Sequence, residues 1–514
     1  MATEPKANGR EARPGPLTPA ARRRSPVREP AWNLSDELLG LEAGAEHVDA
    51  YAYGEPRPAP PAPPRPEPSR PTPQRPKPAV RAPVRLPRGL DRHAPAAISI
   101  GLVGLAVLLQ SASVVSSFAG GAGGSLAAEP SHAEVAPGGR LAFAGDGAPG
   151  GAELLLETRT PQGAWHQVGE ALANDDGRFR VQGRVAAGPG RVAARVRAAG
   201  GGTTTPVAVT VRPLRLASVG DINLGDAPGA AIAAEGPAYP WESAGRALRR
   251  ADIAFGNLEA AVSKRGTPFP KQYNFRGTPA ALAGLRRHAG IDVLNLANNH
   301  VGDFGPTALL DTVRSVERLG MRAVGAGPGL GRALAPQVVE RLGLRVAFVG
   351  FSNILPLEFA AAPGRPGVAW ATPEAVEEAV RAARREADVV VATFHWGIEK
   401  APYETAEQAE LARVAADAGA QLVIGAHPHV LQPLRRTGSA LVAYSLGNFV
   451  FGAQSPETAA TGVLVTDLSA EGVTAARWRP GEISGGRPVL AKGRPKRLPV
   501  GDADAMAVGL TLGG

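Results

Sequence analysis

Five short polar clusters in the C-terminal half of the sequence combine the side chain types that bind divalent metal ions. They are Gly220-Asp221-Ile222-Asn223, Gly256-Asn257-Leu258-Glu259, Asn298-Asn299-His300, Phe394-His395-Trp396-Gly397 and Gly425-Ala426-His427-Pro428-His429. Carboxylate, carboxamide and imidazole groups that converge from several chain segments suit such an ion, and a shared carboxylate can hold two ions about 3.5 to 4 Å apart. The chain has no cysteine, so oxygen and nitrogen atoms must supply every ligand. These clusters predict one or two divalent ions, of Mn, Zn or Fe.

Any one cluster alone is a weak signal, because an Asp after a strand is often a helix cap and His-Pro-His can form a turn. Each cluster, however, directly follows an apolar run, such as 214–219, 251–255, 291–296, 387–394 or 420–425. Amphipathic segments at 278–290, 372–387 and 406–420 separate these runs. Such alternation is typical of an α/β layered domain with mostly parallel strands. Ligands bind in these folds at the carboxyl ends of the strands, where the clusters lie.

Between residues 213 and 494 the sequence resembles the CapA family of capsule synthesis proteins, named for roles in poly-gamma-glutamate synthesis and anchoring. The resemblance rests on the successive motifs SVGDINLGD, FGNLEAAVS, NFRGTP, LNLANNHVGDFG, TFHWGIE, IGAHPHVLQP and YSLGNFVF. The CapA family is in turn similar to the calcineurin-like metallophosphoesterases. This resemblance implies a fold of two packed sheets flanked by helices.

The resemblance also implies individual roles. The residues at metal-ligand positions are Asp221, Asn223, Asn257, Glu259, Asn299, His395, His427 and His429. Either Asn257 or Glu259 matches the bridging aspartate, and we favour Glu259 because a carboxylate bridges better than an amide. His300 matches the histidine that stabilises the transition state and would act as an acid or charge stabiliser. With Asn223 in place of a histidine and Asn257 in place of an aspartate, we expect one metal to bind more weakly or not at all.

Four further residues are candidates for the site, and three of them have two readings each. Asp303 could orient His300 as a hydrogen-bond acceptor or cap the helix that follows. Arg276 could bind a carboxylate or phosphate of the substrate or form a surface ion pair. Trp396 could stack on substrate or pack in the core, and Asn448 could make a polar contact in the cleft.

The N-terminal quarter has a different composition. Residues 1–94 are rich in proline, and between Arg57 and Arg92 nine Arg and Lys face only Glu67 and Asp91, which predicts a disordered tail. Residues 95–119 contain an uncharged apolar stretch long enough to span a membrane. The basic residues before it predict a cytoplasmic N-terminus and extracytoplasmic C-terminal domains in a single-pass cell-membrane protein.

After a Gly-rich hinge at 120–129, residues 130–212 alternate apolar and polar positions between regularly spaced turns. This pattern predicts a small β-sandwich, loosely similar to immunoglobulin-like or fibronectin-like modules, which would act as a stalk or a polymer-facing spacer. Residues 495–514 are expected to form a C-terminal extension.

Three functions are compatible with these features. The first is a membrane-anchored capsule or exopolymer protein, for synthesis, export or anchoring, that binds an anionic extracellular polymer of the poly-gamma-glutamate type and cleaves or transfers it. The second is a metal-dependent phosphoesterase, and the third is a non-catalytic polymer-binding scaffold. The net charge of +9 lies largely in the tail, so no nucleic-acid partner is expected. The sequence contains no P-loop, so an ATP-driven step would require a partner synthetase in the membrane.

Overall fold

The computed structural model describes residues 126–499. The predicted tail at 1–94, the predicted span at 95–119 and most of the predicted hinge lie outside that range. Within residues 126–499, no helix is long and apolar enough to cross a membrane. The described chain forms a small two-sheet β domain followed by a larger mixed α/β domain.

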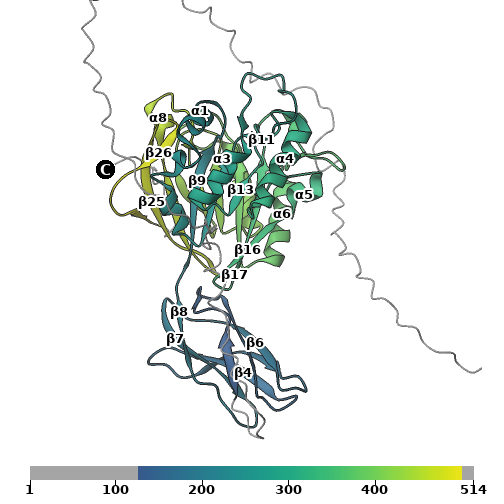
Figure 1. The fold of residues 1–514 in the computed structure, drawn as a ribbon, viewed down its shortest axis with the longest axis vertical. Helices are drawn as coiled ribbons and strands as arrows, with labels where there is room; N and C mark the ends of the chain where they lie inside the picture. The colour runs from purple at the N-terminus through teal and green to yellow at the C-terminus, as the bar shows by residue number, and fades with distance from the viewer. Residues whose placement is uncertain (1–125, 500–514) are drawn as a thin grey trace, which may run out of the picture. The chain divides into compact units, whose positions relative to one another are not determined.

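The β domain consists of a three-stranded and a five-stranded sheet (Figure 1). The first contains β1 (Ala127–Pro130), β3 (Arg140–Asp146) and β6 (Phe179–Arg184). The second has the order β2 (Glu134–Val135), β8 (Val207–Val211), β7 (Gly190–Ala198), β4 (Glu153–Arg159) and β5 (His166–Leu172). Alternate residues such as Phe143, Leu154 and Val196 are fully buried in one core between the sheets. Residues 127–129, which the sequence placed in the hinge, belong instead to strand β1, which pairs with β3.

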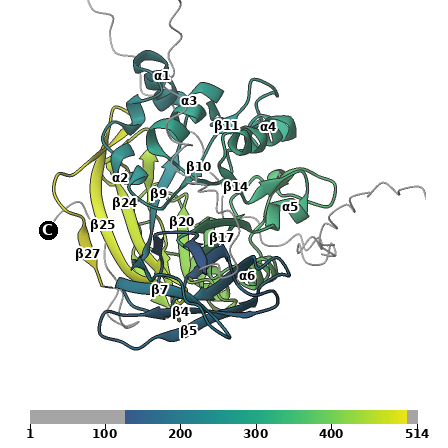
Figure 2. The same ribbon diagram turned by 60° about the horizontal axis from the view of Figure 1, so that its bottom comes forward.

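A nine-stranded sheet forms one half of the α/β domain. Its order is β14 (Arg322–Val324), β13 (Val293–Asn295), β10 (Ile253–Leu258), β9 (Leu214–Ile222), β24 (Ala460–Ser469), β25 (Gly472–Ser484) and β26 (Arg487–Leu490), while β23 (Asn448–Val450) pairs with β9 and β27 (Lys496–Leu498) with β25. The strands from β14 to β9 are parallel, and β24 to β27 are antiparallel additions (Figure 2). The sheet therefore continues beyond residue 494, where the sequence predicted an extension.

A six-stranded sheet forms the other half, in the order β16 (Gln337–Arg341), β17 (Leu344–Ser352), β19 (Val389–His395), β20 (Leu422–Ala426), β22 (Ala440–Ala443) and β21 (Leu434–Thr437). Its four central strands are parallel and its two edge strands antiparallel. Apolar residues of both sheets, including Leu216, Phe255, Phe348 and Val391, share one buried core. The two sheets therefore pack face to face through these side chains.

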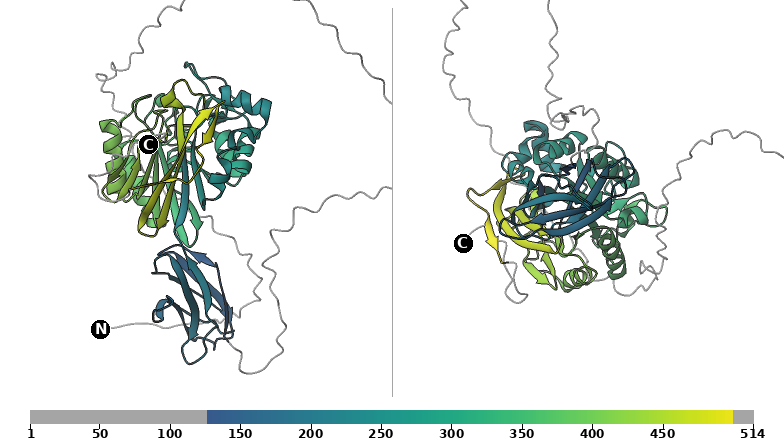
Figure 3. Two further views of the ribbon diagram at one scale, coloured as in Figure 1. Left: turned by 90° about the vertical axis from the view of Figure 1, so that its left-hand side faces the viewer. Right: turned by 90° about the horizontal axis from the view of Figure 1, so that it is seen from below.

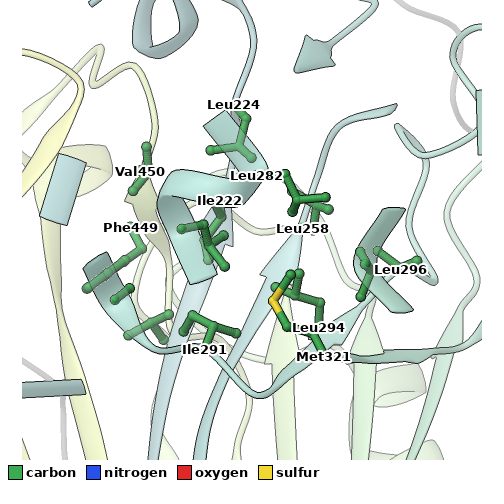
Figure 4. Close-up of a cluster of buried hydrophobic side chains, with 14 of the residues drawn as sticks. Ile222, Leu224, Leu258, Leu282, Ile291, Leu294, Leu296, Met321, Phe449 and Val450 are labelled. Carbon is green, nitrogen blue, oxygen red and sulfur yellow. The ribbon is translucent and has the colours of Figure 1, made fainter. Parts of the chain in front are cut away.

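Helices cover the outer face of each sheet, and the left-hand view of Figure 3 shows the two groups on opposite sides of the strands. On the nine-stranded sheet, α3 (Pro279–Gly284) and α4 (Gly305–Arg318) pack on a core that includes Ile222, Leu258 and Leu294 (Figure 4). On the six-stranded sheet, α6 (Pro373–Glu386) and α7 (Ala406–Asp417) pack on Val349, Val390 and Val423. The smaller elements are α1 (Asp226–Glu235), α2 (Gly245–Arg249), α5 (Leu330–Leu334) and α8 (Pro456–Ala459), with the short pairs β11 (Ala261–Val262) with β12 (Arg276–Gly277) and β15 (Ala326–Gly327) with β18 (Gly367–Val368).

Local sequence signals start these helices. Thr278, Thr372 and Thr405 are the N-caps of α3, α6 and α7, and each accepts a backbone hydrogen bond from the third helical residue. The predicted helix at 278–290 is α3 followed by a π-helical turn, Leu285–Ala289. It ends at Gly290 with a φ of 72°, a left-handed conformation that glycine adopts without a steric cost. These helices hold the strands whose carboxyl ends carry the polar clusters.

Candidate metal centre

Both sheets present their carboxyl strand ends to one candidate metal centre. In the nine-stranded sheet, Asn257 of β10 lies opposite Asp221 of β9 and Asn295 of β13. In the six-stranded sheet, His395 at the end of β19 lies opposite Ala426 at the end of β20. Because the strands within each set are parallel, the residues that follow them emerge at one edge. The expectation that the clusters converge from several strand ends is met by this geometry.

Two overlapping groups of side chains have the arrangement of metal ligands. Glu259, His427 and His429 form one group, and Asp221, Glu259 and His395 form the other, with the potential ligand atoms of each group within 4.8 Å of one another. Glu259 belongs to both groups, which favours it over Asn257 as the shared carboxylate. The donors are carboxylate oxygens and imidazole nitrogens, a set that suits Zn, Mn or Fe.

Glu259 is the most unusual side chain of the site. It is fully buried, and neither of its carboxylate oxygens has a hydrogen-bond partner among the described residues. Its Oε1 lies 3.6 Å from Nε2 of His395 and 3.8 Å from Nε2 of both His300 and His429. Burial raises the pKa of Glu259 well above its usual value, and the neighbouring Asp221 raises it further. A buried carboxylate without a partner is costly unless a cation neutralises it, so the residues present fit a divalent ion.

Two of the histidines, His395 and His427, are neutral, as a metal-binding imidazole must be. Burial lowers the pKa of His395 and His427 well below the usual value, and the neighbouring imidazoles lower it further, so both are neutral near pH 7. Burial also acts to lower the pKa of His429, but the hydrogen bond and charge of Asp221, whose Oδ2 lies 3.3 Å from its Nδ1, raise it overall. The Nδ1 atom of His427 has no hydrogen-bond partner among the described residues and is free to coordinate an ion.

The backbone at the two paired histidines is unusual. His427 has a φ of 96° and His429 a φ of 60°, values that few residues other than glycine adopt. Pro428 between them accepts a backbone hydrogen bond from Lys400. Such backbone conformations occur mainly at functional sites, where the surrounding structure maintains them. Here they turn both imidazoles toward Glu259.

The three asparagines among the predicted ligands differ from one another. Asn299 directs its Oδ1 to within 3.0 Å of Nε2 of His395, so this oxygen lies at the cluster. The side chain of Asn257 instead donates from Nδ2 to Oδ1 of Asp221 at 2.8 Å, and its oxygen accepts from Asn295 at 2.9 Å. It orients Asp221 and does not present a ligand oxygen.

Asn223, the other substitution relative to the phosphoesterase pattern, accepts a hydrogen bond from the backbone nitrogen of Gly225 at 2.7 Å. Its amide oxygen thus closes a local turn after β9. Neither Asn223 nor Asn257 offers an oxygen to the cluster in this arrangement, because each amide is occupied by a neighbouring donor.

His300 is fixed by two residues. Its Nδ1 lies 2.8 Å from Oδ2 of Asp303, and its ring stacks on Phe275 with the ring centroids 3.9 Å apart. Asp303 also accepts from the backbone nitrogen of Phe275 at 2.6 Å and pairs with Lys271 at 2.6 Å. The N-cap of α4 is Phe304, with no side-chain cap. Asp303 therefore orients the imidazole and does not cap the helix.

Lys271 is a site residue that the sequence analysis did not identify. Its Nζ donates to the backbone oxygen of Asn299 at 2.5 Å and lies 3.2 Å from Nδ1 of His300. Burial lowers the pKa of Lys271, while the charge and hydrogen bond of Asp303 oppose that shift. Lys271 lies in an irregular segment before NFRGTP, so no helical or strand periodicity of the sequence could have identified it.

The three predicted substrate contacts have different outcomes. Trp396 is fully buried and donates from Nε1 to the backbone oxygen of Tyr444 at 2.9 Å, which is the packing role. The Arg276 guanidinium lies 3.6 Å from the ring centroid of Phe304 and donates to Gly266. Asn448 accepts from Nδ1 of His429 at 2.9 Å, so it orients a candidate ligand. Among the described residues, none of the three forms a hydrogen bond with Glu259.

The fold and the ligand set define a mixed α/β domain with a candidate metal centre at its strand ends. Residues 215–453 match the sequence model of a family described as "Bacterial capsule synthesis protein PGA_cap". The α/β domain is therefore similar to CapA-type capsule synthesis proteins, as its motifs led us to expect.

Named relatives have the same similarity. The chain is 34% identical over 207 residues to "PGA biosynthesis protein CapA" of Bacillus subtilis, covering 40% of this chain and 54% of that protein. It is 31% identical over 247 residues to "Capsule biosynthesis protein CapA" of Bacillus anthracis, covering 46% of this chain and 60% of the relative. The chain thus spans between half and two thirds of the length of these relatives.

Among solved structures, the chain is similar to the NAD nucleotidase of Haemophilus influenzae, with a TM-score of 0.33 and 15% identity over 55% of this chain and 60% of that one. It is also similar to TT1561 of Thermus thermophilus, with a TM-score of 0.29 and 13% identity over 52% of this chain and 99% of that one.

Proposed function

We propose that this chain is a membrane-anchored capsule protein whose α/β domain binds a divalent metal ion and processes an anionic polymer of the poly-gamma-glutamate type outside the membrane. The observation that carries the metal-dependent part is the buried, unpartnered Glu259 carboxylate among His395, His427 and His429. Similarity to the capsule synthesis family supports the capsule role.

The residues of the site have different proposed roles. Asp221, Glu259, His395, His427 and His429 would hold the ion, with Asn299 at its edge. When bound, a divalent ion supplies positive charge that polarises an oxygen of the substrate.

His300 supplies the proton chemistry. Its Nδ1 faces Asp303 and its Nε2 faces the cluster, and burial lowers its pKa although Asp303 opposes the shift. The neutral imidazole therefore presents Nε2 toward a substrate bound at the cluster, where it can exchange a proton with a reacting group.

Anchoring and partners form the second part of the proposal. The apolar segment at 95–119 would hold the chain in the membrane, and a membrane synthetase would supply the ATP-dependent step. Two alternative functions remain. A metal-dependent phosphoesterase would hydrolyse a phosphoester at the site, and a non-catalytic scaffold would bind polymer without converting it.

Elemental analysis combined with complementation tests the proposal. Wild-type protein loaded with Mn or Zn should retain metal after desalting, whereas a His395→Ala, His427→Ala double variant should not, because two imidazole ligands are lost. The variant should also fail to restore polymer at the surface of cells that lack the wild-type gene. Equal metal content in both proteins would refute the assignment of His395 and His427 as metal ligands.

The same preparations separate the alternatives. Turnover of a generic phosphodiester by the wild type but not by the double variant would identify a phosphoesterase. Full restoration of surface polymer by a variant that binds no metal would identify a scaffold. As a control, His288→Ala removes a histidine at the end of the π-helical turn, outside the cluster, and should change neither readout.

A further inference from the structure

The outer face of the five-stranded sheet in the β domain carries an ordered group of arginines. Along β7, Val192, Ala194 and Val196 are buried, so Arg191, Arg195 and Arg197 point away from the core. In the neighbouring strand β4, Glu157 lies opposite Arg195. The group is therefore built on two adjacent strands of one sheet.

One carboxylate holds two of these guanidinium groups. Arg195 donates from Nε to Oε2 of Glu157 at 2.8 Å, and Arg197 donates from Nε to Oε1 at 3.0 Å. Glu157 is only 7% exposed. Burial would raise its pKa, but the hydrogen bonds from both arginines lower it below the usual value, so the carboxylate stays ionised and holds both side chains in place.

Trp165 supports the group from the side. Its ring centroid lies 4.0 Å from the Arg195 guanidinium carbon and 4.8 Å from that of Arg159. A planar guanidinium stacked on an indole loses little further freedom when it binds a ligand. Arg195 and Arg197 use only Nε for their hydrogen bonds to Glu157, and among the described residues their terminal amino nitrogens make no hydrogen bond.

The charge of this face is unbalanced around Trp165, where Arg159, Arg195 and Arg197 surround the single carboxylate of Glu157. The other acidic residues of the face lie further along the strands: Glu153 at the start of β4, Glu170 on β5 opposite Leu155, and Glu134 on β2, which pairs with Arg212. Leu172 is the one large exposed hydrophobic side chain within the β domain as described. Charge and oriented donors, rather than apolar area, are what this surface offers to a partner.

We infer that this arginine face, formed by Arg159, Arg191, Arg195 and Arg197 around Trp165, binds a linear polymer with regularly spaced carboxylates. Free guanidinium edges bind carboxylates through paired hydrogen bonds. Successive outward residues of a strand lie roughly 7 Å apart and adjacent strands about 4.8 Å apart, so the donors follow an extended chain. The inference rests on the proposed function only for the choice of polymer, because the face contains none of the candidate metal ligands.

Binding of the full-length protein to poly-gamma-glutamate tests the inference. The double variant Arg159→Gln, Arg197→Gln keeps the pair between Arg195 and Glu157 and should raise the Kd about tenfold, because two charged contacts contribute about 0.7 kcal/mol each. The control variant Arg178→Gln, Arg180→Gln removes two exposed charges near or on β6, in the other sheet, and should bind as the wild type does.

Three results would overturn the inference. An unchanged Kd in the first variant would remove the face from polymer binding, and equal weakening in both variants would show that only net charge matters. Unchanged polymer binding with lost binding to phosphatidylglycerol vesicles would identify the partner as a membrane surface.

A separate arm distinguishes this inference from the proposed function. In metal-free protein prepared with EDTA, Arg159→Gln, Arg197→Gln should still raise the Kd for the polymer about tenfold, because the arginine face contains none of the candidate metal ligands. If the wild type binds no metal while the arginine variant still loses polymer affinity, the face is confirmed and the metal-dependent function is refuted.

Discussion

Glu259 connects the two groups of candidate ligands at the scale of single residues. A protein interior rarely contains a carboxylate with two unsatisfied oxygens, because desolvation costs several kcal/mol unless a charge compensates it. Of the surrounding histidines, His395 and His427 are neutral and compensate little of that charge. The site is therefore least stable without an ion, and binding of an ion should be visible in the stability of the whole domain.

The first prediction concerns Glu259. At a free Mn or Zn concentration about 100-fold above its Kd, the wild type should be stabilised by about 2.7 kcal/mol, whereas Glu259→Gln should show little stabilisation because it lacks the shared carboxylate. Thermal unfolding with the ion and with EDTA measures both. Glu340→Gln, at an exposed position, is the control and should retain the full shift. The same shift in Glu259→Gln would exclude this residue as a ligand.

A second prediction separates the role of His300 from that of the metal ligands. His300→Ala should keep its metal and fold but lose the activity of the wild type, because its imidazole faces the cluster without being needed to complete it. Asp303→Asn should lose activity less completely, since the imidazole remains but its orientation and tautomer are no longer fixed. Metal content and turnover are measured on the same samples. Loss of metal in His300→Ala would make His300 a ligand.

At the scale of elements, the order and direction of the strands decide which side chains meet at the candidate metal centre. The parallel order of β14, β13, β10 and β9, and of β17, β19, β20 and β22, sends each polar cluster to a common edge. Face-to-face packing through Phe255 and Phe348, whose ring centroids are 5.9 Å apart, holds the two edges in position. The antiparallel strand β24 extends the first sheet on the far side of β9 and adds no candidate ligand.

An ion pair at the start of β9 and β10 leads to a pH prediction. Arg212 donates to both oxygens of Asp252 at 2.8 Å, and the backbone nitrogen of Arg215 donates to one of them. Burial would raise the pKa of Asp252, but the hydrogen bonds and charge of Arg212 lower it overall. A lowered folded-state pKa contributes stability above the unfolded-state value of about 3.9 and loses it as the pH falls through the folded-state value.

Asp252→Asn should therefore lower the free energy of unfolding by about 1 to 2 kcal/mol at pH 7, and the deficit should shrink as the pH falls below about 4. Urea unfolding at a series of pH values measures it. Asp417→Asn, which removes an exposed partner of Arg413, should have a much smaller effect, because solvent screens exposed ion pairs. A deficit for Asp252→Asn that is independent of pH would contradict the assignment.

The whole molecule combines a β domain and an α/β domain behind a predicted membrane segment. If residues 95–119 span the membrane with the basic flank inside, protease added to intact cells should degrade both described domains and protect the tail. Immunoblots with antibodies against the tail and against the α/β domain give the readout, and a cytoplasmic protein serves as the lysis control. Full-length protein in the soluble fraction would contradict anchoring.

Much of the fold follows from local sequence patterns. Apolar runs predicted the parallel strands and amphipathic segments predicted the helices, because hydrophobic periodicity acts over a few residues. The strands β24 to β27 were not predicted as such. Their pairing with β9 and with one another depends on contacts across the sheet, which no short window of sequence contains.

The sequence by itself determined the resemblance of the α/β domain to CapA-type proteins and the residue types of its candidate metal centre, since both depend on motifs that lie together along the chain. Only the tertiary structure decided that Glu259 is shared, that Asn257 and Asn223 are occupied by neighbouring donors, and that Lys271 joins Asp303 and His300. It likewise brought Arg159, Trp165 and Arg195 together. The physical reason is that hydrogen-bond partners and burial are set by packing between distant segments, and these decide which atoms of a side chain remain free to bind.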